Sequence, residues 1–441
     1  MTDAPSSTVM TVLAHGVGGR TDLPLTAWQA GWSAGVALAF SFVALGLLWR
    51  RPQLRSLAAG RPLGATTAGV QWRVVPALRW ITMALFVVVI TAGLVGQDDT
   101  GANAVPVVVY VAFWVGIPLL AVLIGPFWSS LSPWETLAGL SDREDPEYRP
   151  VPPSFFANGW ATLVPVSAFL WLELVYHDGA QPRVLGWAAL GYTLTVIGIS
   201  YRWGRDVARS AEGFGTLFSL IARLSPIGRG PSGRLVVRPP LVGAVVDDLR
   251  PSELALVLVV LGGTAFDGMS RTRFWSEVSA GRSGWESTAV GTIGLLWMVI
   301  LVGVLFHLAS RFGDRLTGRT GFSDQFGHSL LPILLGYHVA HYFSMLVLEG
   351  QMIRVLASDP YGRGWDLFGT ASDAVNWTLV SPTTVGWVQL GAIISGHLAG
   401  VLVAHDRSVE LWQPATALRS QYPMFAVMVL YTVFGLVLMT G

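Results

Sequence analysis

The chain has 441 residues, of which 52% are hydrophobic and only 12% are charged, and its formal net charge is +1. Soluble proteins carry about 25% charged residues, so this composition indicates a polytopic membrane protein and gives no sign of a nucleic-acid partner. Cysteine and lysine are both absent. Disulfides, thiol nucleophiles, iron–sulfur clusters, covalently attached haem c and Schiff-base chemistry are therefore excluded.

The first 26 residues predict an extracytoplasmic arm rather than a signal peptide, because they lack a basic start and a long apolar run. Ten apolar segments of roughly 18–24 residues follow, each long enough to cross the membrane as a helix. Their approximate bounds are 27–49, 76–97, 105–127, 156–176, 184–201, 253–270, 286–310, 326–349, 383–405 and 422–440. The sequence therefore predicts an all-α, multi-pass transmembrane bundle of about ten spans in the plasma membrane.

Arginine distribution orients this bundle. With both termini outside, the inner connections hold 21 arginines and the outer side holds 7. Cytoplasmic loops carry the excess of basic residues, so we expect both termini outside the cell. The predicted organisation is an arm (1–26), five spans (27–201), a cytoplasmic Arg-rich connection (202–252) and five further spans (253–441).

Two inner connections predict structure of their own. Ser132-Pro133-Trp134-Glu135 has the cap, proline and glutamate that begin a helix. In the second connection, apolar residues between 214 and 224 recur at helical spacing, which predicts an amphipathic helix. That helix either rests in the membrane interface or packs beneath the bundle. A short strand is predicted at 235–237.

Histidines on the later spans are the main functional signal, because an ionisable group inside a bilayer is a functional-site hypothesis by default. His338 and His341 lie three residues apart on one helix face, and His397 on the next span has a similar depth. Three imidazoles suit a Zn, Cu or Fe ion, and two on facing helices suit haem b. A proton or solute path and purely structural hydrogen bonds are the other readings. No carboxylate is expected at this depth.

A second set of groups is predicted at the inner edge of the membrane. It consists of His307, His328, His405 and Asp406. Such groups are hydrated at a membrane edge and can serve as anchors, so a structural role competes with a site.

Acidic residues from separate spans are predicted near the outer edge, where they could form a vestibule for a cation. They are Glu173, Asp267 and Glu349, with His15 of the arm above them. Solvation at the interface explains the same placement, because charges within a turn of the surface can reach water.

Several stretches together resemble a family of polytopic actinobacterial proteins labelled fenitrothion hydrolase. They are AHG at 14–16, RTDLP at 20–24, WLELV at 171–175, FDGMSRT at 266–272, AHYFS at 340–344, GWDLFG at 364–369 and AHDR at 404–407. The resemblance implies hydrolysis of an aryl phosphotriester. It carries over His341, His397, His405, Asp406, Asp267 and Glu173, whereas His338 has no counterpart in the pattern.

The leading hypothesis is a membrane protein that binds or conducts a small cation, metal or proton through a histidine-lined bundle. The alternatives are a membrane-embedded, metal-dependent hydrolase of lipophilic phosphotriesters, a haem b or quinone-linked electron-transfer subunit, and a structural or assembly subunit. The expected partners are the lipid bilayer, a small cation or lipophilic small molecule, and other membrane proteins. Whether the protein is an enzyme stays open at this point.

Overall fold

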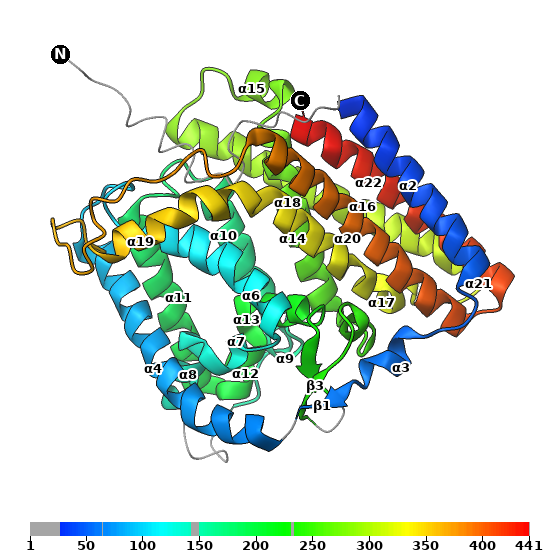
Figure 1. Cartoon of the computed structure of the whole chain (residues 1–441), viewed down its shortest axis with the longest axis horizontal. Coiled ribbons are helices and arrows are strands. Elements are labelled where there is room, and N and C mark those ends of the chain that lie inside the picture. Colours follow the sequence, from blue (N-terminus) through cyan, green and yellow to red (C-terminus); the bar gives the residue numbers. More distant parts are fainter. Residues whose placement is uncertain (1–26, 64, 143–149, 231–232, 441) are drawn as a thin grey trace. The chain divides into compact units, whose positions relative to one another are not determined.

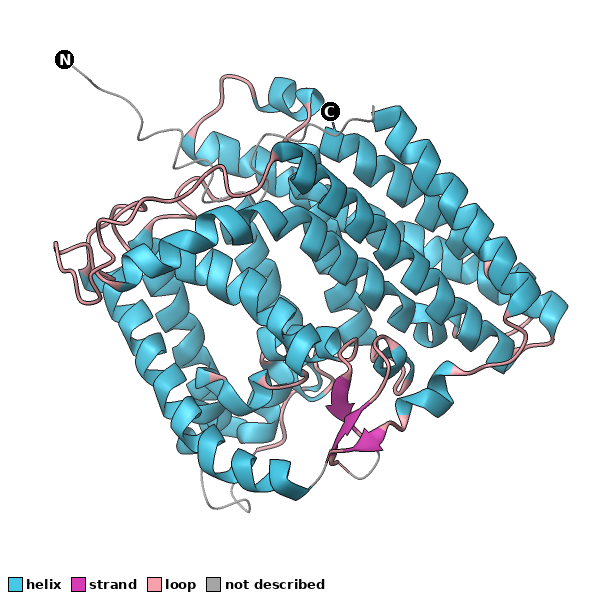
Figure 2. Ribbon diagram, viewed as in Figure 1, coloured by secondary structure: helices cyan, strands magenta, loops and turns pink. Residues whose placement is uncertain are grey.

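The computed structural model describes residues 27–63, 65–142, 150–230 and 233–440, and it is almost entirely helical (Figures 1 and 2). The predicted arm, including His15, lies outside the described residues. The chain forms two compact units. The first contains 63–219 and 344–380, and the second contains 19–62, 220–343 and 381–441. Each unit therefore combines segments that are distant in sequence, and the predicted organisation by successive spans stays a prediction.

Within the described residues, eight helices are long and apolar enough to cross a membrane. They are α2 (Ala27–Leu48), α4 (Ala65–Val95), the run α5–η1–α6 (Val105–Ile124), α11 (Pro182–Trp203), α14 (Pro251–Ser270), α16 (Gly284–Thr317), the run from α17 to α19 (Phe322–Ala357) and α20 (Pro382–Leu411). All eight coincide with predicted spans. The chain is thus a multi-pass helical membrane protein.

The fourth predicted span, 156–176, is shorter than expected. Its helical part is η3 (Trp160–Thr162) followed by α10 (Leu163–Leu174), because Gly159 adopts a positive φ of 75° and separates this helix from α9 (Ser154–Ala157). The tenth is helical as α22 (Tyr422–Thr440). The count of ten spans and the outward position of both termini stay predictions.

The first unit has an aromatic core built around α8 (Pro133–Ser141). The predicted cap is confirmed, because Ser132 Oγ accepts a hydrogen bond from the backbone N–H of Glu135 at 3.3 Å. The ring of Trp134 lies 5.6 Å from Phe113, 4.9 Å from Tyr192 and 5.9 Å from Phe214. These rings come from four different helices, so the aromatic cluster joins them into one core.

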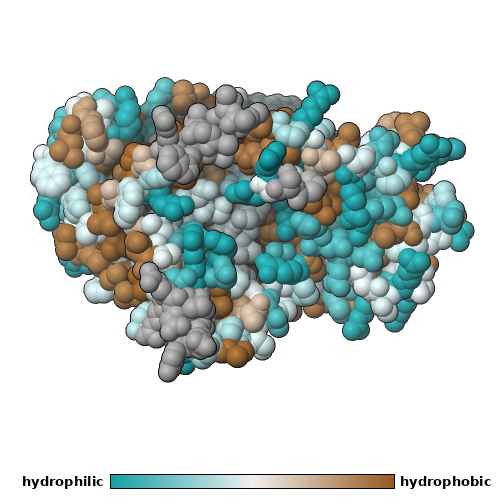
Figure 3. All heavy atoms as spheres, turned by 90° about the horizontal axis from the view of Figure 1, so that it is seen from below, coloured by the Kyte–Doolittle hydropathy of each residue, from teal (hydrophilic) through white to brown (hydrophobic). Residues whose placement is uncertain are grey.

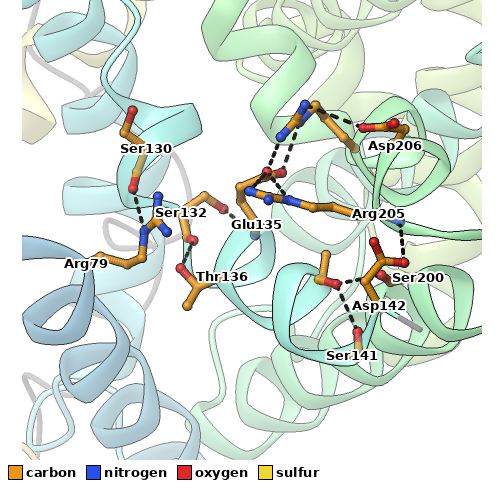
Figure 4. A network of polar contacts seen from close by, with 12 residues as sticks. Arg79, Ser130, Ser132, Glu135, Thr136, Ser141, Asp142, Ser200, Arg205 and Asp206 are labelled. Atoms are coloured by element: carbon orange, nitrogen blue, oxygen red, sulfur yellow. Dashed lines mark hydrogen bonds and ion pairs between the residues drawn. The ribbon is translucent and has the colours of Figure 1, made fainter. Parts of the chain in front are cut away.

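An ion pair network around one buried carboxylate lies beside this core (Figure 4). Glu135 is 8% exposed and accepts hydrogen bonds from Arg205 at 2.8 Å and from the Nε of Arg209 at 3.2 Å. Both arginines lie on α12 (Arg205–Ala211). Two cations on one carboxylate leave that carboxylate fully compensated, so the network fastens α12 to α8.

The predicted amphipathic helix is α13 (Gly213–Ala222), and it packs within the protein. Its apolar side chains Phe214, Leu217, Phe218 and Ile221 are at most 5% exposed. Of the two readings left open by the sequence, the structure supports the packed one. A helix resting in the membrane interface would expose these side chains to lipid instead.

The second unit contains α2, α14, α16, α20, α22 and most of α18 (Leu330–Leu348). It also holds a small antiparallel sheet of order β1-β3-β2, formed by β1 (Arg61–Pro62), β3 (Leu235–Val237) and β2 (Ile227–Arg229). The strand predicted at 235–237 is therefore confirmed.

Large hydrophobic side chains are exposed on the membrane-length helices, among them Phe40 (76%) and Ile293 (70%). Figure 3 shows hydrophobic patches on the face that it draws. Apolar patches of this kind on long helices are what contact with a lipid bilayer requires.

Candidate functional site: a buried histidine–aspartate pair

The central feature of the second unit is a direct contact between Asp267 of α14 and His341 of α18. The Nε2 atom of His341 bonds to Oδ2 of Asp267. Both residues are buried, with 1% of Asp267 and 2% of His341 exposed. An ionisable pair inside an apolar bundle is stable only when its members satisfy each other, so this contact is a built feature of the fold.

Arg271 provides the opposite charge for the pair. It follows the last residue of α14, and its Nε lies 3.6 Å from Oδ1 of Asp267. Ser270 Oγ also approaches Oδ1, at 3.5 Å. The guanidinium therefore places a positive charge beside the carboxylate of the pair.

His338 lies on the same helix as His341, and both rings contact Tyr342. The ring centroid of Tyr342 is 4.7 Å from that of His341 and 5.0 Å from that of His338. His338 is 5% exposed. The structure therefore brings the two predicted histidines of α18 to one tyrosine, and His341 also contacts Asp267.

His397 of α20 has a fixed tautomer and one open nitrogen. Its Nδ1 lies 2.9 Å from the carbonyl oxygen of Ile393, and because a carbonyl only accepts, Nδ1 carries the proton. Its buried Nε2 has no hydrogen-bond partner, so an unshared lone pair remains there. This is the arrangement in which an imidazole accepts a proton or ligates a metal.

Tyr337 connects His397 to neighbouring helices. Its ring centroid is 5.6 Å from that of His397, and its hydroxyl donates to the carbonyl of Tyr431 at 3.2 Å. The hydroxyl of Tyr431 in turn donates to the carbonyl of Leu261 on α14 at 3.0 Å. Helices α14, α18, α20 and α22 are thus joined around the histidines.

Glycines bring α18 and α20 into backbone contact beside His397. A Cβ added at Gly396 would lie 2.8 Å from the carbonyl oxygen of Pro332 and 3.0 Å from the Cα of Gly336. One turn further, a Cβ at Gly400 would lie 2.9 Å from the carbonyl oxygen of Ser329. Gly396 and Gly400 form a GxxxG pattern, which permits the close helix approach common in membranes.

The expectation that no carboxylate lies at the depth of the buried histidines is wrong. The reading that interfacial water solvates Asp267, Glu173 and Glu349 is not supported either, because these residues are only 1%, 3% and 3% exposed. Glu173 and Glu349 belong to the first unit and Asp267 to the second. The outer vestibule stays a prediction.

The positions of Asp267 and His341 along their helices already indicated that the two residues lie at a similar depth. Asp267 stands sixteen positions after the start of α14, or about 24 Å along the axis, and His341 is about 22 Å from the start of its span by the same measure. Sequence reasoning placed Asp267 at the outer edge because it lies near a helix end. The partner on the neighbouring helix is what keeps it buried.

Metal binding by His338, His341 and His397 stays a prediction without geometric support. Among the residues that the structure describes, no three or more His, Asp or Glu side chains are grouped so that they could hold a metal ion. His341 is committed to Asp267, and His397 presents a single open nitrogen.

His405 and Asp406 at the predicted inner edge hold the chain that follows α2. Asp406 accepts hydrogen bonds from Trp49 Nε1 at 2.8 Å and from the backbone N–H of Gln53 at 2.7 Å and Leu54 at 3.2 Å. It thereby caps α3 (Leu54–Ala58). His405 contacts the carbonyl of Trp49 at 3.1 Å and the side-chain amide of Gln421 at 3.1 Å. These contacts support the structural reading of the two residues.

The other two predicted edge histidines differ from each other. His307 on α16 is exposed. His328 is 1% exposed, and neither of its ring nitrogens has a hydrogen-bond partner. The expectation that both are hydrated is therefore wrong for His328.

The comparisons with known proteins add nothing narrower than the class that the fold defines, a multi-pass helical membrane protein. No protein-family model matches the chain, and neither a curated protein nor a solved structure matches it.

Proposed function

We propose that this membrane protein binds and transfers a proton at the Asp267–His341 pair. The observation that carries the proposal is the direct contact between a carboxylate and an imidazole, both buried in an apolar helix bundle. Intramembrane acidic and histidine residues of this kind mark ion pathways and proton relays.

Ligand requirements support a proton as the cation. Arg271 lies 3.6 Å from Asp267, so a cation already faces the carboxylate of the pair. A metal ion would need further ligands in the same place, and the described side chains do not group in that way. A proton needs only the two atoms that are already in contact.

His397 supplies a second acceptor in the same unit. Its Nε2 keeps an open lone pair while Nδ1 stays bonded to Ile393. An imidazole nitrogen with an open lone pair can accept a proton. We propose His397 as a second proton-binding group of the same unit.

The test uses purified protein in liposomes that contain a pH-sensitive dye, with a potassium gradient and valinomycin to drive proton entry. We expect Asp267→Asn and His341→Gln each to lower the rate at least tenfold. His307→Gln is the matched control, because His307 is exposed on α16, and its rate should equal that of the wild type. Unchanged rates in both pair variants would reject the proposal.

Hydrolysis is a second candidate function, favoured by the same pair. A histidine held by a carboxylate is the general-base arrangement that activates a nucleophile, and the resemblance to the fenitrothion hydrolase family implies an aryl phosphotriester. His341 would take a proton from water as the water oxygen bonds to phosphorus and the aryloxide leaves. Incubation with fenitrothion, with and without added Zn²⁺, tests this candidate. This candidate is supported if the wild type releases the nitrophenol and His341→Gln does not. It is rejected if the wild type releases none under either condition.

A further inference from the structure

The connection between α19 (Met352–Ala357) and α20 presents large apolar side chains on its outside. We call residues 358–380 the aromatic loop. Five of its large apolar side chains are at least 40% exposed: Trp365 (40%), Leu367 (61%), Phe368 (70%), Trp377 (50%) and Leu379 (55%). A loop in contact with water would be expected to present mostly polar side chains instead.

Two polar side chains at the start of the aromatic loop, Ser358 and Asp359, bond to the backbone of the loop. The carboxylate of Asp359 accepts hydrogen bonds from the backbone N–H groups of Arg363 at 2.9 Å, Gly364 at 2.5 Å and Trp365 at 3.0 Å. Burial acts to raise the pKa of Asp359, but these N–H bonds outweigh it and lower the pKa below its usual value. Asp359 is therefore charged at neutral pH and organises the turn.

Ser358 holds the next part of the loop in the same way. Its hydroxyl accepts from the backbone N–H of Phe368 at 3.1 Å and pairs with the hydroxyl of Thr370 at 2.7 Å. Thr370 also donates to the carbonyl of Arg354 at 2.7 Å. These contacts order the backbone next to the exposed ring of Phe368.

The aromatic loop thus exposes five large apolar side chains at fixed positions of its backbone. Burial of large apolar side chains is favourable, so leaving five exposed to water would forgo a large stabilisation. The arrangement is favourable where the surroundings are themselves partly apolar. Contiguous exposed apolar patches mark interaction sites or membrane contact.

We propose that the aromatic loop lies in the interfacial region of the lipid bilayer, with Phe368 and Leu367 reaching toward the acyl chains. The loop directly connects two membrane-length helices, ending at Ala357 and beginning at Pro382, so its two ends are at the membrane. Tryptophans are enriched at this depth of a bilayer. The guanidinium of Arg363 stacks 5.3 Å from Tyr361 and 5.7 Å from Trp365, where it could meet lipid phosphates.

The test is site-specific labelling of an introduced cysteine. Because the chain has no cysteine of its own, the label attaches at the introduced position alone. Phe368→Cys is labelled with an environment-sensitive fluorophore, and the full chain is reconstituted in phosphatidylcholine vesicles. Two reference positions set the scale: Asp206→Cys, whose native side chain is 97% exposed on the short helix α12, and Phe40→Cys, which is 76% exposed on the membrane-length helix α2.

We expect the label at position 368 to emit at shorter wavelength than the label at 206 and to be quenched by lipids with a spin label near the headgroup. The label at 40 should be quenched more strongly by lipids labelled deep in the acyl chain. Emission and iodide quenching at 368 equal to those at 206 would overturn the proposal. Protection from both lipid and iodide quenchers would also overturn it, because a protein would then cover the loop. None of these outcomes depends on proton transfer.

Discussion

His341 Nε2 and Asp267 Oδ2 are in hydrogen-bond contact although the two residues are 74 positions apart in the chain. The contact joins α14 to α18 inside the second unit, and it pairs a buried histidine of α18 with a buried carboxylate. Its consequences for stability and for proton binding can be separated by substitution.

We expect Asp267→Ala to destabilise the protein by about 3–5 kcal/mol, because removing one member of a buried pair leaves the other uncompensated. Asp267→Asn should be less harmful, since the amide keeps the shape and a hydrogen bond to His341. Thermal unfolding in detergent measures both. The double variant Asp267→Asn/His341→Gln should lose less than the sum of the single losses, and strict additivity would show that the two side chains are not coupled.

Stability should depend on pH through Glu212, which lies outside the membrane-length helices. Burial, opposed by hydrogen bonds from Tyr192 and from backbone N–H groups, raises the pKa of Glu212 from 4.5 to about 7. A carboxyl whose pKa is higher in the folded state favours folding at low pH. That contribution is complete below pH 4.5 and is lost as the pH rises through about 7, at about 1.4 kcal/mol per pKa unit.

The corresponding measurement is the melting temperature at pH 5 and pH 8 for the wild type and Glu212→Gln. Glutamine keeps the size of the side chain and can still meet Tyr192 and Gly215, whose contacts with Glu212 are 2.9 and 2.6 Å. The wild type should lose more stability over this interval than the variant. Identical losses in both proteins would contradict the assignment to Glu212.

Gly396→Leu should separate α18 from α20 and destabilise the second unit, because its Cβ would meet the Pro332 carbonyl oxygen at 2.8 Å. Gly391→Leu is a matched control on the same helix, since a Cβ there meets nothing within 4 Å. The control should be neutral or stabilising by up to about 1 kcal/mol from helix propensity. Melting temperatures of the two variants in one detergent decide the question, and equal melting temperatures would count against the close approach.

Asp406→Asn should loosen the chain that follows α2. Asparagine retains one acceptor oxygen, whereas Asp406 serves three donors at Trp49, Gln53 and Leu54. Each unsatisfied buried donor costs about 1–3 kcal/mol. Hydrogen–deuterium exchange at the amides of Gln53 and Leu54 should accelerate by at least tenfold. The control is Asp324→Asn, because the exposed Asp324 contacts only the Ser323 hydroxyl in the described structure, and it should leave that exchange unchanged.

Hydropathy alone predicted where the long helices lie, because a run of apolar residues long enough to cross lipid has few other stable conformations. It failed at 156–176, where one glycine with a positive φ shortens the helix. The cap at Ser132 was predictable because its chemistry is local.

Features that depend on distant contacts were beyond such reasoning. The pairing of Val236 and Val237 with Pro62 and Arg61 requires knowing how widely separated segments meet. The burial of His328 likewise reflects the elements that cover it rather than its distance from a helix end. Asp267 was predictable in part. Its depth could be calculated from its position in the helix, but its pairing with His341 could not.

The glycine contact between α18 and α20 also limits what can pass between these two helices of the second unit. Where the backbones at Gly336 and Gly396 are in contact, neither an acyl chain nor a hydrated ion has room to pass between α18 and α20. The two helices therefore form one closely packed pair beside His397, and a solute could reach this histidine only from another side.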